Sequence, residues 1–245
     1  MKQGIISISI IMSLLHISCQ KQTLPDIDSG PQHTGYVTIR GVPGYAQSIQ
    51  FFFSVPSGYS PKKSWPMIIA LHNSGSNANE MHVAWRLTAD SVHCVLLTIQ
   101  GDITYDSGYG WGRNAEIALM DCIKSMHSLV NISMHKIFLI GEGTGGFTAL
   151  EIGLKYPKKF AGLGVLNGVY DFHAFGKLAD QNHPCRIYIE YLKHDDIVLD
   201  ALHAAHILEQ NGHQVRLKQI DNDTKSTSMR DVMLSYLGIL SQENR

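Results

Sequence analysis

The sequence predicts an α/β protein with a mostly parallel central sheet and helices on both of its faces. Strand-length apolar runs alternate with helix-length amphipathic runs along most of the chain, an order that favours parallel strands joined by helices. The run 66–71 is apolar throughout, as expected of a strand that is buried on both faces. With 245 residues, 44% of them hydrophobic, the chain is long enough for one large domain with a substantial core.

The individual elements follow from hydrophobic periodicity and from turn residues. Strands are predicted at 36–39, 49–55, 66–71, 94–99, 136–140, 161–166, 186–191 and 214–220. Helices are predicted at 78–91, 113–130, 147–156, 198–211 and 227–240. Within 113–130 the apolar residues recur at i, i+4, i+7 and i+11, which places them on one face of a helix: Leu119, Ile123, Met126 and Val130.

The N-terminus has the pattern of an export signal. Lys2 precedes an apolar stretch at 5–17, and Ser18-Cys19 follow it. This pattern resembles a bacterial lipoprotein signal, in which Cys19 becomes the lipidated first residue; an ordinary secretory signal and a plain N-terminal strand are the alternatives. We expect export to the bacterial cell envelope, with membrane attachment only through a lipid at Cys19. The expected division is a signal segment at 1–19, a flexible tether at 20–34 and a folded domain at 35–245.

Composition narrows the classes of partner and cofactor. A formal net charge of −1 gives no basis for nucleic-acid binding. Cys94, Cys122 and Cys185 are widely spaced in apolar surroundings, so they are expected to be buried thiols rather than a disulfide framework. His203 and His206 stand three residues apart on a predicted helix but lack a third ligand, so no metal site is expected. No cofactor is predicted.

The segment 141–146 reads Gly-Glu-Gly-Thr-Gly-Gly, and it lies between a predicted strand and a predicted helix. A strand–turn–helix of this kind is where an α/β-hydrolase carries its nucleophile, in the motif G-x-S-x-G. Gly143 stands at the serine position. Thr144 would then supply a backbone N–H group to an oxyanion hole, and Gly145 and Gly146 would permit close packing of the strand and the helix.

Three other motifs occur with it. Leu71-His72-Asn73-Ser74-Gly75-Ser76 follows the third predicted strand, and the others are Tyr109-Gly110-Trp111-Gly112 and Tyr156-Pro157-Lys158-Lys159-Phe160-Ala161-Gly162. On these motifs the chain resembles the secreted esterase and polyhydroxybutyrate-depolymerase-like (carboxylesterase or phospholipase-like) branch of the α/β-hydrolases, over about residues 49–240. The resemblance implies that the 71–76 loop supplies a second oxyanion donor, with Asn73 at a usual glycine. It also implies that His72 shapes the loop, while Ser74 and Trp111 lie at the pocket.

The catalytic triad of that family is incomplete here. Asp195 matches the position of the family's acid, because Val198 follows it at the spacing of the valine in the family's motif. Asp196 is the second candidate for the acid. The other interpretation of Asp195 is a solvated carboxylate in a loop. The family's histidine should follow the last strand, but the loop 221–227 has none, and no histidine follows His213. Two of the three triad positions therefore lack the catalytic side chain.

The glycines also fit G-x-G-x-x-G, the fingerprint of a dinucleotide site, through Gly141, Gly143 and Gly146. Against it, the strand before them is a late one, and no acidic residue stands about 20 positions further on. Leu166 and Asn167 occupy those positions.

The sequence thus predicts an esterase-like pseudo-hydrolase that keeps a pocket for a small acyl or carboxylate ligand. The pocket would be bounded by Asn73, Ser74, Trp111, Gly143 and Thr144. One alternative is an active carboxylic-ester hydrolase with rewired residues, in which His72 or Asp195 activates water or Ser74. The other is a non-enzymatic binding protein of the cell envelope.

Overall fold

The structure is a computed structural model, and it describes residues 34–39, 48–171, 183–194, 196–221 and 233–239. The predicted signal with Cys19 and all but the last residue of the predicted tether lie outside these residues. Asp195 and most of the loop 221–227 do so as well.

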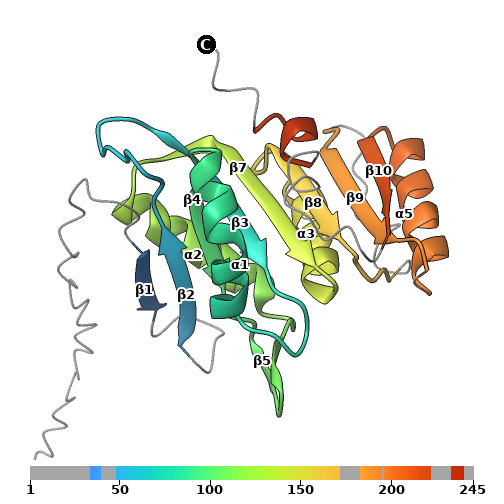
Figure 1. The fold of residues 1–245 in the computed structure, drawn as a ribbon, viewed down its shortest axis with the longest axis horizontal. Coiled ribbons are helices and arrows are strands. Elements are labelled where there is room, and N and C mark those ends of the chain that lie inside the picture. The colour runs from blue at the N-terminus through green and yellow to red at the C-terminus, as the bar shows by residue number, and fades with distance from the viewer. Residues whose placement is uncertain (1–33, 40–47, 172–182, 195, 222–232, 240–245) are drawn as a thin grey trace, which may run out of the picture.

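An eight-stranded sheet forms the centre of the fold (Figure 1). Its strand order is β1-β2-β4-β3-β7-β8-β9-β10, in which β2 is antiparallel to β1 and β4 and all other neighbours are parallel. The prediction of a mostly parallel sheet is therefore confirmed. The strands are β1 (Thr34–Ile39), β2 (Ile49–Ser54), β3 (Trp65–Leu71), β4 (Val95–Ile99), β7 (Ile132–Glu142), β8 (Gly162–Leu166), β9 (Arg186–Leu192) and β10 (Gln214–Ile220).

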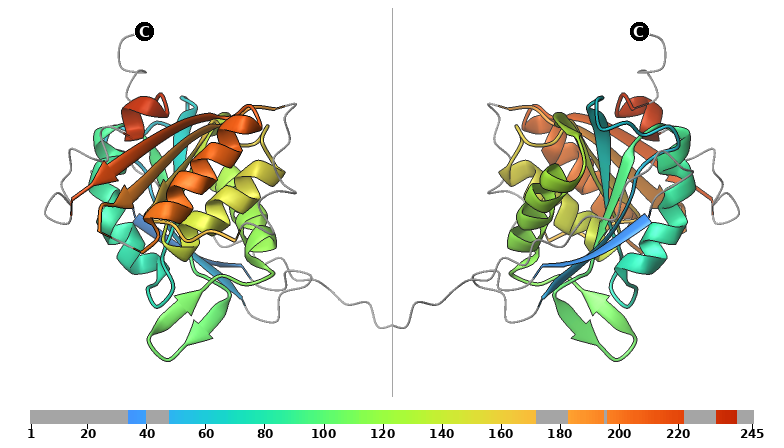
Figure 2. Two further views of the ribbon diagram at one scale, coloured as in Figure 1. Left: turned by 90° about the vertical axis from the view of Figure 1, so that its right-hand side faces the viewer. Right: turned by 90° about the vertical axis from the view of Figure 1, so that its left-hand side faces the viewer.

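Helices cover both faces of this sheet (Figures 1 and 2). Alternate residues of β3 point to opposite faces, as the period of a strand requires, and all of them from Met67 to Leu71 are buried. Ile69 packs in a core with α2, α3 and α5, whereas Ile68 packs with α1 and the segment 233–239. The helices are α1 (Ala78–Ser91), α2 (Ala115–Leu129), α3 (Thr144–Lys155) and α5 (Val198–Gln210).

A small hairpin was not predicted from the sequence. It consists of β5 (Ile103–Tyr105) and β6 (Gly108–Gly110), which pair antiparallel outside the main sheet. Three exposed residues in β5 give no alternating burial pattern, so periodicity could not reveal the strand. Tyr109 of the hairpin exchanges backbone hydrogen bonds with the loop after β3, through Gly75 N (2.9 Å) and Ser76 O (2.9 Å). The hairpin thus braces that loop.

Other boundaries differ by a few residues. The predicted helix 113–130 begins at Ala115, and the predicted strand 136–140 extends to Ile132–Glu142. The predicted thiols are buried, and burial raises the pKa of Cys94 to about 12 and that of Cys185 to about 11. Among the described residues, no helix has the length and apolarity needed to traverse a bilayer.

Candidate functional site

The turn between β7 and α3 has the geometry of an elbow. β7 ends at Glu142, α3 begins at Thr144, and Gly143 between them has φ 54° and ψ −120°. Residues that carry a side chain rarely adopt a positive φ, so this position favours glycine. A second glycine is needed because the helix starts so close to β3. A Cβ atom on Gly145 would lie 2.4 Å from the carbonyl oxygen of His72.

The side chain of Asn73 occupies the space beside Gly143. A Cβ atom on Gly143 would lie 2.1 Å from Asn73 Oδ1 and 2.4 Å from its Cγ, well inside van der Waals contact. Asn73 Oδ1 accepts hydrogen bonds from Thr144 N (3.1 Å) and Ser74 N (2.9 Å). Because two N–H donors converge on this atom, it must be the amide oxygen rather than the nitrogen.

The sequence indicated Thr144 N as one donor of an oxyanion hole, and a second donor from the loop after the third strand without naming its residue. In the structure, the first donor belongs to the first residue of α3 and the second, Ser74 N, to the loop after β3. The site that would face a developing oxyanion in a hydrolase therefore holds the amide oxygen of the chain itself. Asn73 was predicted to border the pocket, but its sequence position alone gave no sign that it fills the hole.

Ser74 and Thr144 lie together at the elbow, as neighbours in space rather than in sequence. Their hydroxyl oxygens are 2.8 Å apart, and Ser74 N donates to Thr144 Oγ1 (3.0 Å). Among the described residues, neither hydroxyl has a histidine or carboxylate partner. Neither is therefore paired with a general base, which a nucleophilic hydroxyl requires.

His72 is buried, and both of its ring nitrogens are engaged. Gly101 N donates to Nε2 (3.0 Å), so this nitrogen is unprotonated, and Nδ1–H donates to Asn73 O (2.8 Å). Burial lowers the pKa of His72, which keeps the ring neutral. The ring orders the backbone at Asn73 and has no free nitrogen with which to take a proton from Ser74.

Trp111 supports the same loop from the other side. Its indole Nε1 donates to His72 O (2.7 Å), and its ring centroid lies 4.9 Å from that of His72. Trp111 was predicted at the pocket; it contacts the pocket's loop and is not among the residues that line the cavity beside it.

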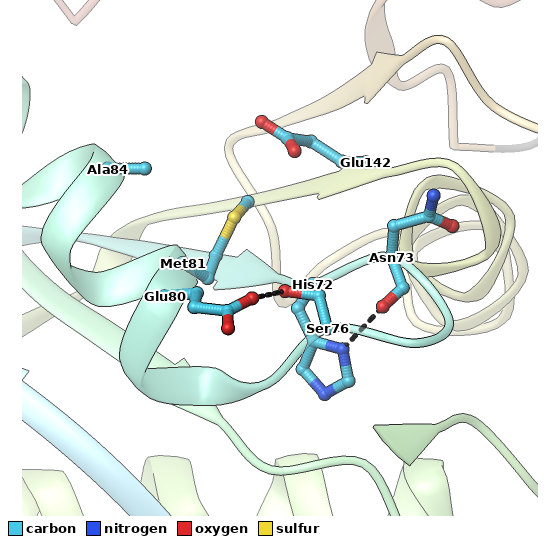
Figure 3. Close-up of a pocket in the computed structure, with 7 residues that line it drawn as sticks. All are labelled: His72, Asn73, Ser76, Glu80, Met81, Ala84 and Glu142. Atoms are coloured by element: carbon cyan, nitrogen blue, oxygen red, sulfur yellow. Dashed lines mark hydrogen bonds between the residues drawn. The ribbon is translucent and has the colours of Figure 1, made fainter. Parts of the chain in front are cut away.

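A cavity of about 190 Å³ adjoins Asn73 on the α1 side of the elbow (Figure 3). Sequence reasoning found two of its lining residues, His72 and Asn73, and missed the other five. Glu142 could have been found from the sequence, because it is the last residue of the strand and directly precedes the elbow glycine, Gly143. The missed residues are Ser76, Glu80, Met81, Ala84 and Glu142.

The predicted acid and base positions can be placed only in part. Asp195 lies outside the described residues, and its fallback Asp196 is exposed. His213 is buried just before β10, where its Nδ1 accepts a hydrogen bond from Cys185 N (3.0 Å). That is the amino end of the parallel strands, whereas Gly143 lies at the carboxyl end, so His213 cannot serve the elbow. His203 and His206 are exposed on α5.

Metal and dinucleotide sites gain no support from the geometry. Within the described part of the chain, no three His, Cys, Asp or Glu side chains gather as a metal site would require. The strand order also differs from the 3-2-1-4-5-6 arrangement of the dinucleotide-binding fold, and Gly141 and Gly145 pack against neighbouring backbone.

No protein-family model and no curated protein sequence matches the chain. Solved structures do match. An S-formylglutathione hydrolase from Staphylococcus aureus aligns with a TM-score of 0.65 and 13% identity over 84% of this chain and 99% of its own. A bacterial heroin esterase aligns with a TM-score of 0.68 and 12% identity over 88% of this chain and 85% of its own. An S-formylglutathione hydrolase from Agrobacterium tumefaciens aligns with a TM-score of 0.65 and 14% identity over 85% of this chain and 96% of its own. Together with the strand order and the elbow, these matches show that the chain has the α/β-hydrolase fold.

Proposed function

We propose that this protein is a non-hydrolytic member of the esterase-like α/β-hydrolases, and that it binds a small acyl or carboxylate ligand at the elbow. The observation that carries the proposal is the placement of Asn73. Its amide oxygen lies 2.1 Å from the position that the Cβ atom of a nucleophile would take, too close for both to be present, and it accepts hydrogen bonds from Ser74 N and Thr144 N.

The chemistry of a serine hydrolase needs a nucleophile, a base and an oxyanion hole. Gly143 has no hydroxyl group, and the chain has no histidine beyond His213. His72 lies in the loop that contacts the elbow, but both of its nitrogens are used. In a serine protease, loss of the nucleophile or the base alone lowers kcat by about a millionfold.

A binding role is supported by what remains. Two backbone N–H groups converge at the first turn of the 12-residue helix α3, an arrangement that favours an anionic oxygen. Similar folds include esterases named for ferulic acid and heroin, whose ester cleavage yields a carboxylate. A small carboxylate is therefore the ligand class that we propose for this chain.

Export as a lipoprotein remains part of the proposal. It rests on the sequence at 1–19 and on Cys19 as the acylated residue. A Cys19→Ser variant that is released from the membrane fraction, while the unaltered protein is retained there, supports it. Equal membrane retention of both forms contradicts it.

Ester turnover by the purified protein is the decisive test. We expect no hydrolysis of p-nitrophenyl acetate, butyrate or octanoate above the buffer rate, and no labelling by a fluorophosphonate probe. Gly143→Ser should be equally inactive, because the base is still missing. Turnover by the unaltered protein that tracks with protein through purification would contradict the proposal.

The hydroxyl pair of Ser74 and Thr144 favours one alternative, a rewired hydrolase, because it places an oxygen nucleophile at the elbow. Ser74→Ala distinguishes the two functions. Loss of a measurable ester activity in this variant, with retention in the control Ser91→Ala on the last residue of α1, would establish the alternative.

A further inference from the structure

We propose that Asn73 is an internal ligand that closes the elbow site, and that a small monocarboxylate opens it by displacing the Asn73 amide. This inference rests on the proposed function for the identity of the ligand. The contact itself rests only on the geometry of Asn73, Ser74, Gly143 and Thr144.

The amide oxygen of Asn73 is placed as a ligand oxygen would be. It joins two segments far apart in the sequence, through Ser74 N at 2.9 Å and Thr144 N at 3.1 Å. Thr144 Oγ1 lies at 3.4 Å from the same oxygen. While the amide stays there, both N–H groups are satisfied and no external oxygen can reach them.

A carboxylate is a stronger acceptor for these N–H groups than the neutral amide. Hydrogen bonds to an ionised acceptor are about twice as strong as neutral ones. The positive end of the α3 dipole adds to this difference, because Thr144 is the first residue of the helix. A carboxylate therefore has the differential interaction that is needed to shift the equilibrium from the closed to the open state.

The surroundings leave Asn73 room to move. Asn73 is exposed, Gly143 presents no side chain to it, and a cavity of about 190 Å³ lies beside it. Figure 3 shows Asn73 on one side of this cavity and Met81 and Ala84 of α1 on the other. A short apolar chain attached to a bound carboxylate fits against those two side chains.

The acidic lining of the cavity disfavours negative charge on a ligand, so the one carboxylate expected there is the one that the N–H groups of Ser74 and Thr144 hold. Glu80 and Glu142 line the cavity, and no lysine or arginine is among its lining residues. A second negative charge on the ligand would be repelled by these carboxylates. Butyrate should therefore bind, and succinate, which has the same chain length and two charges, should bind much more weakly.

Three substitutions of Asn73 in the purified protein test the inference. Asn73→Ala removes the amide and keeps a Cβ atom, Asn73→Gly also frees the backbone, and Asn73→Asp places a permanent carboxylate against the two N–H groups. We expect butyrate to bind on the order of tenfold more tightly to the Ala and Gly variants than to the unaltered protein, because the internal competitor is gone. Asn73→Asp should bind it at least tenfold more weakly.

Amide resonances of Ser74 and Thr144 provide a readout that needs no ligand. In Asn73→Ala the Thr144 proton resonance should move upfield, because its hydrogen bond to Oδ1 is lost, and butyrate should return it downfield. The Ser74 N–H keeps its hydrogen bond to Thr144 Oγ1, so its resonance should move less. Ser91→Ala, on the far end of α1, should change neither resonances nor affinity.

The outcomes separate this inference from the proposed function. Unmoved resonances in ligand-free Asn73→Ala, or equal butyrate affinities in the unaltered protein and Asn73→Ala, overturn the inference while the binding function stands. Ester turnover by the unaltered protein overturns the proposed function, and the ligand-free resonances still decide whether Asn73 occupies the hole.

Discussion

Adding a single methyl group at Gly143 should destabilise the protein by an amount that depends on Asn73. Gly143→Ala brings two separate costs. The first is backbone strain, since φ is 54° at this position. The second is steric overlap, because the new Cβ atom would lie 2.1 Å from Asn73 Oδ1.

The two costs can be estimated separately. Holding a non-glycine residue in a sparsely populated backbone region costs about 1–3 kcal/mol. The overlap is relieved by rotation of Asn73, whose exposed side chain is free to turn but then loses its bonds to Ser74 N and Thr144 N. Each such bond contributes about 0.5–1.5 kcal/mol. We therefore expect Gly143→Ala to cost about 2–6 kcal/mol in the unaltered protein.

With Asn73→Gly already present, only the backbone cost should remain. The loss of unfolding free energy in the double mutant should then be about 1–3 kcal/mol smaller than the sum of the losses in the two single mutants. Gly212→Ala is a matched control: its φ is 83° and no atom lies within 4 Å of its added Cβ, so it reports backbone strain without overlap. Its cost should not change when Asn73 is replaced.

Urea unfolding of the four proteins of the cycle, followed by circular dichroism, measures these free energies, provided that the slope with urea stays constant. A coupling energy below about 0.5 kcal/mol would refute the reasoning, since distant, independent sites add within that margin. It would mean that the Asn73 side chain does not occupy the space beside Gly143.

Three further outcomes follow from the structure. Gly145→Ala should lower the free energy of unfolding, measured in urea, by about 1–3 kcal/mol or more. Its Cβ atom would meet the backbone oxygen of His72, which cannot rotate away as a side chain can. Burial lowers the pKa of His82 to about 4. Stability should thus fall as the pH drops from about 6.5 toward 4, by at most about 1.4 kcal/mol per pH unit for this group, and His82→Asn should flatten the curve. Cys122, whose pKa burial raises well above its ordinary value, should react with a thiol reagent only on unfolding; rapid labelling of the folded protein would contradict its burial.

Much of the fold was predictable because hydrophobic periodicity reports burial directly. β3 is apolar throughout and lies in the middle of the sheet, as the run 66–71 indicated. The β5–β6 hairpin was not predictable, since its stability comes from backbone bonds to the loop at Gly75 and Ser76 rather than from a buried face. Tertiary hydrogen bonding of this kind leaves no local pattern in the sequence.

The candidate site was predictable as a set of positions but not as a set of contacts. The motifs brought Asn73, Ser74 and Thr144 to one elbow, and the structure places them in direct hydrogen-bond contact. Trp111, expected at the pocket, instead donates to the carbonyl of His72. A motif fixes which residues meet, whereas the direction of each side chain depends on the atoms that surround it.

The two departures from the esterase pattern at the elbow are one structural change. In the sequence, an asparagine at position 73 and a glycine at position 143 look independent. In the structure, the side chain of Asn73 fills the volume that Gly143 leaves empty and bonds the N–H groups beside it. A serine at 143 would need both the space and the hole that Asn73 now holds. Under the proposed function, serine-based hydrolysis therefore requires three changes together: the serine, a small residue at position 73 and a histidine within reach of the elbow.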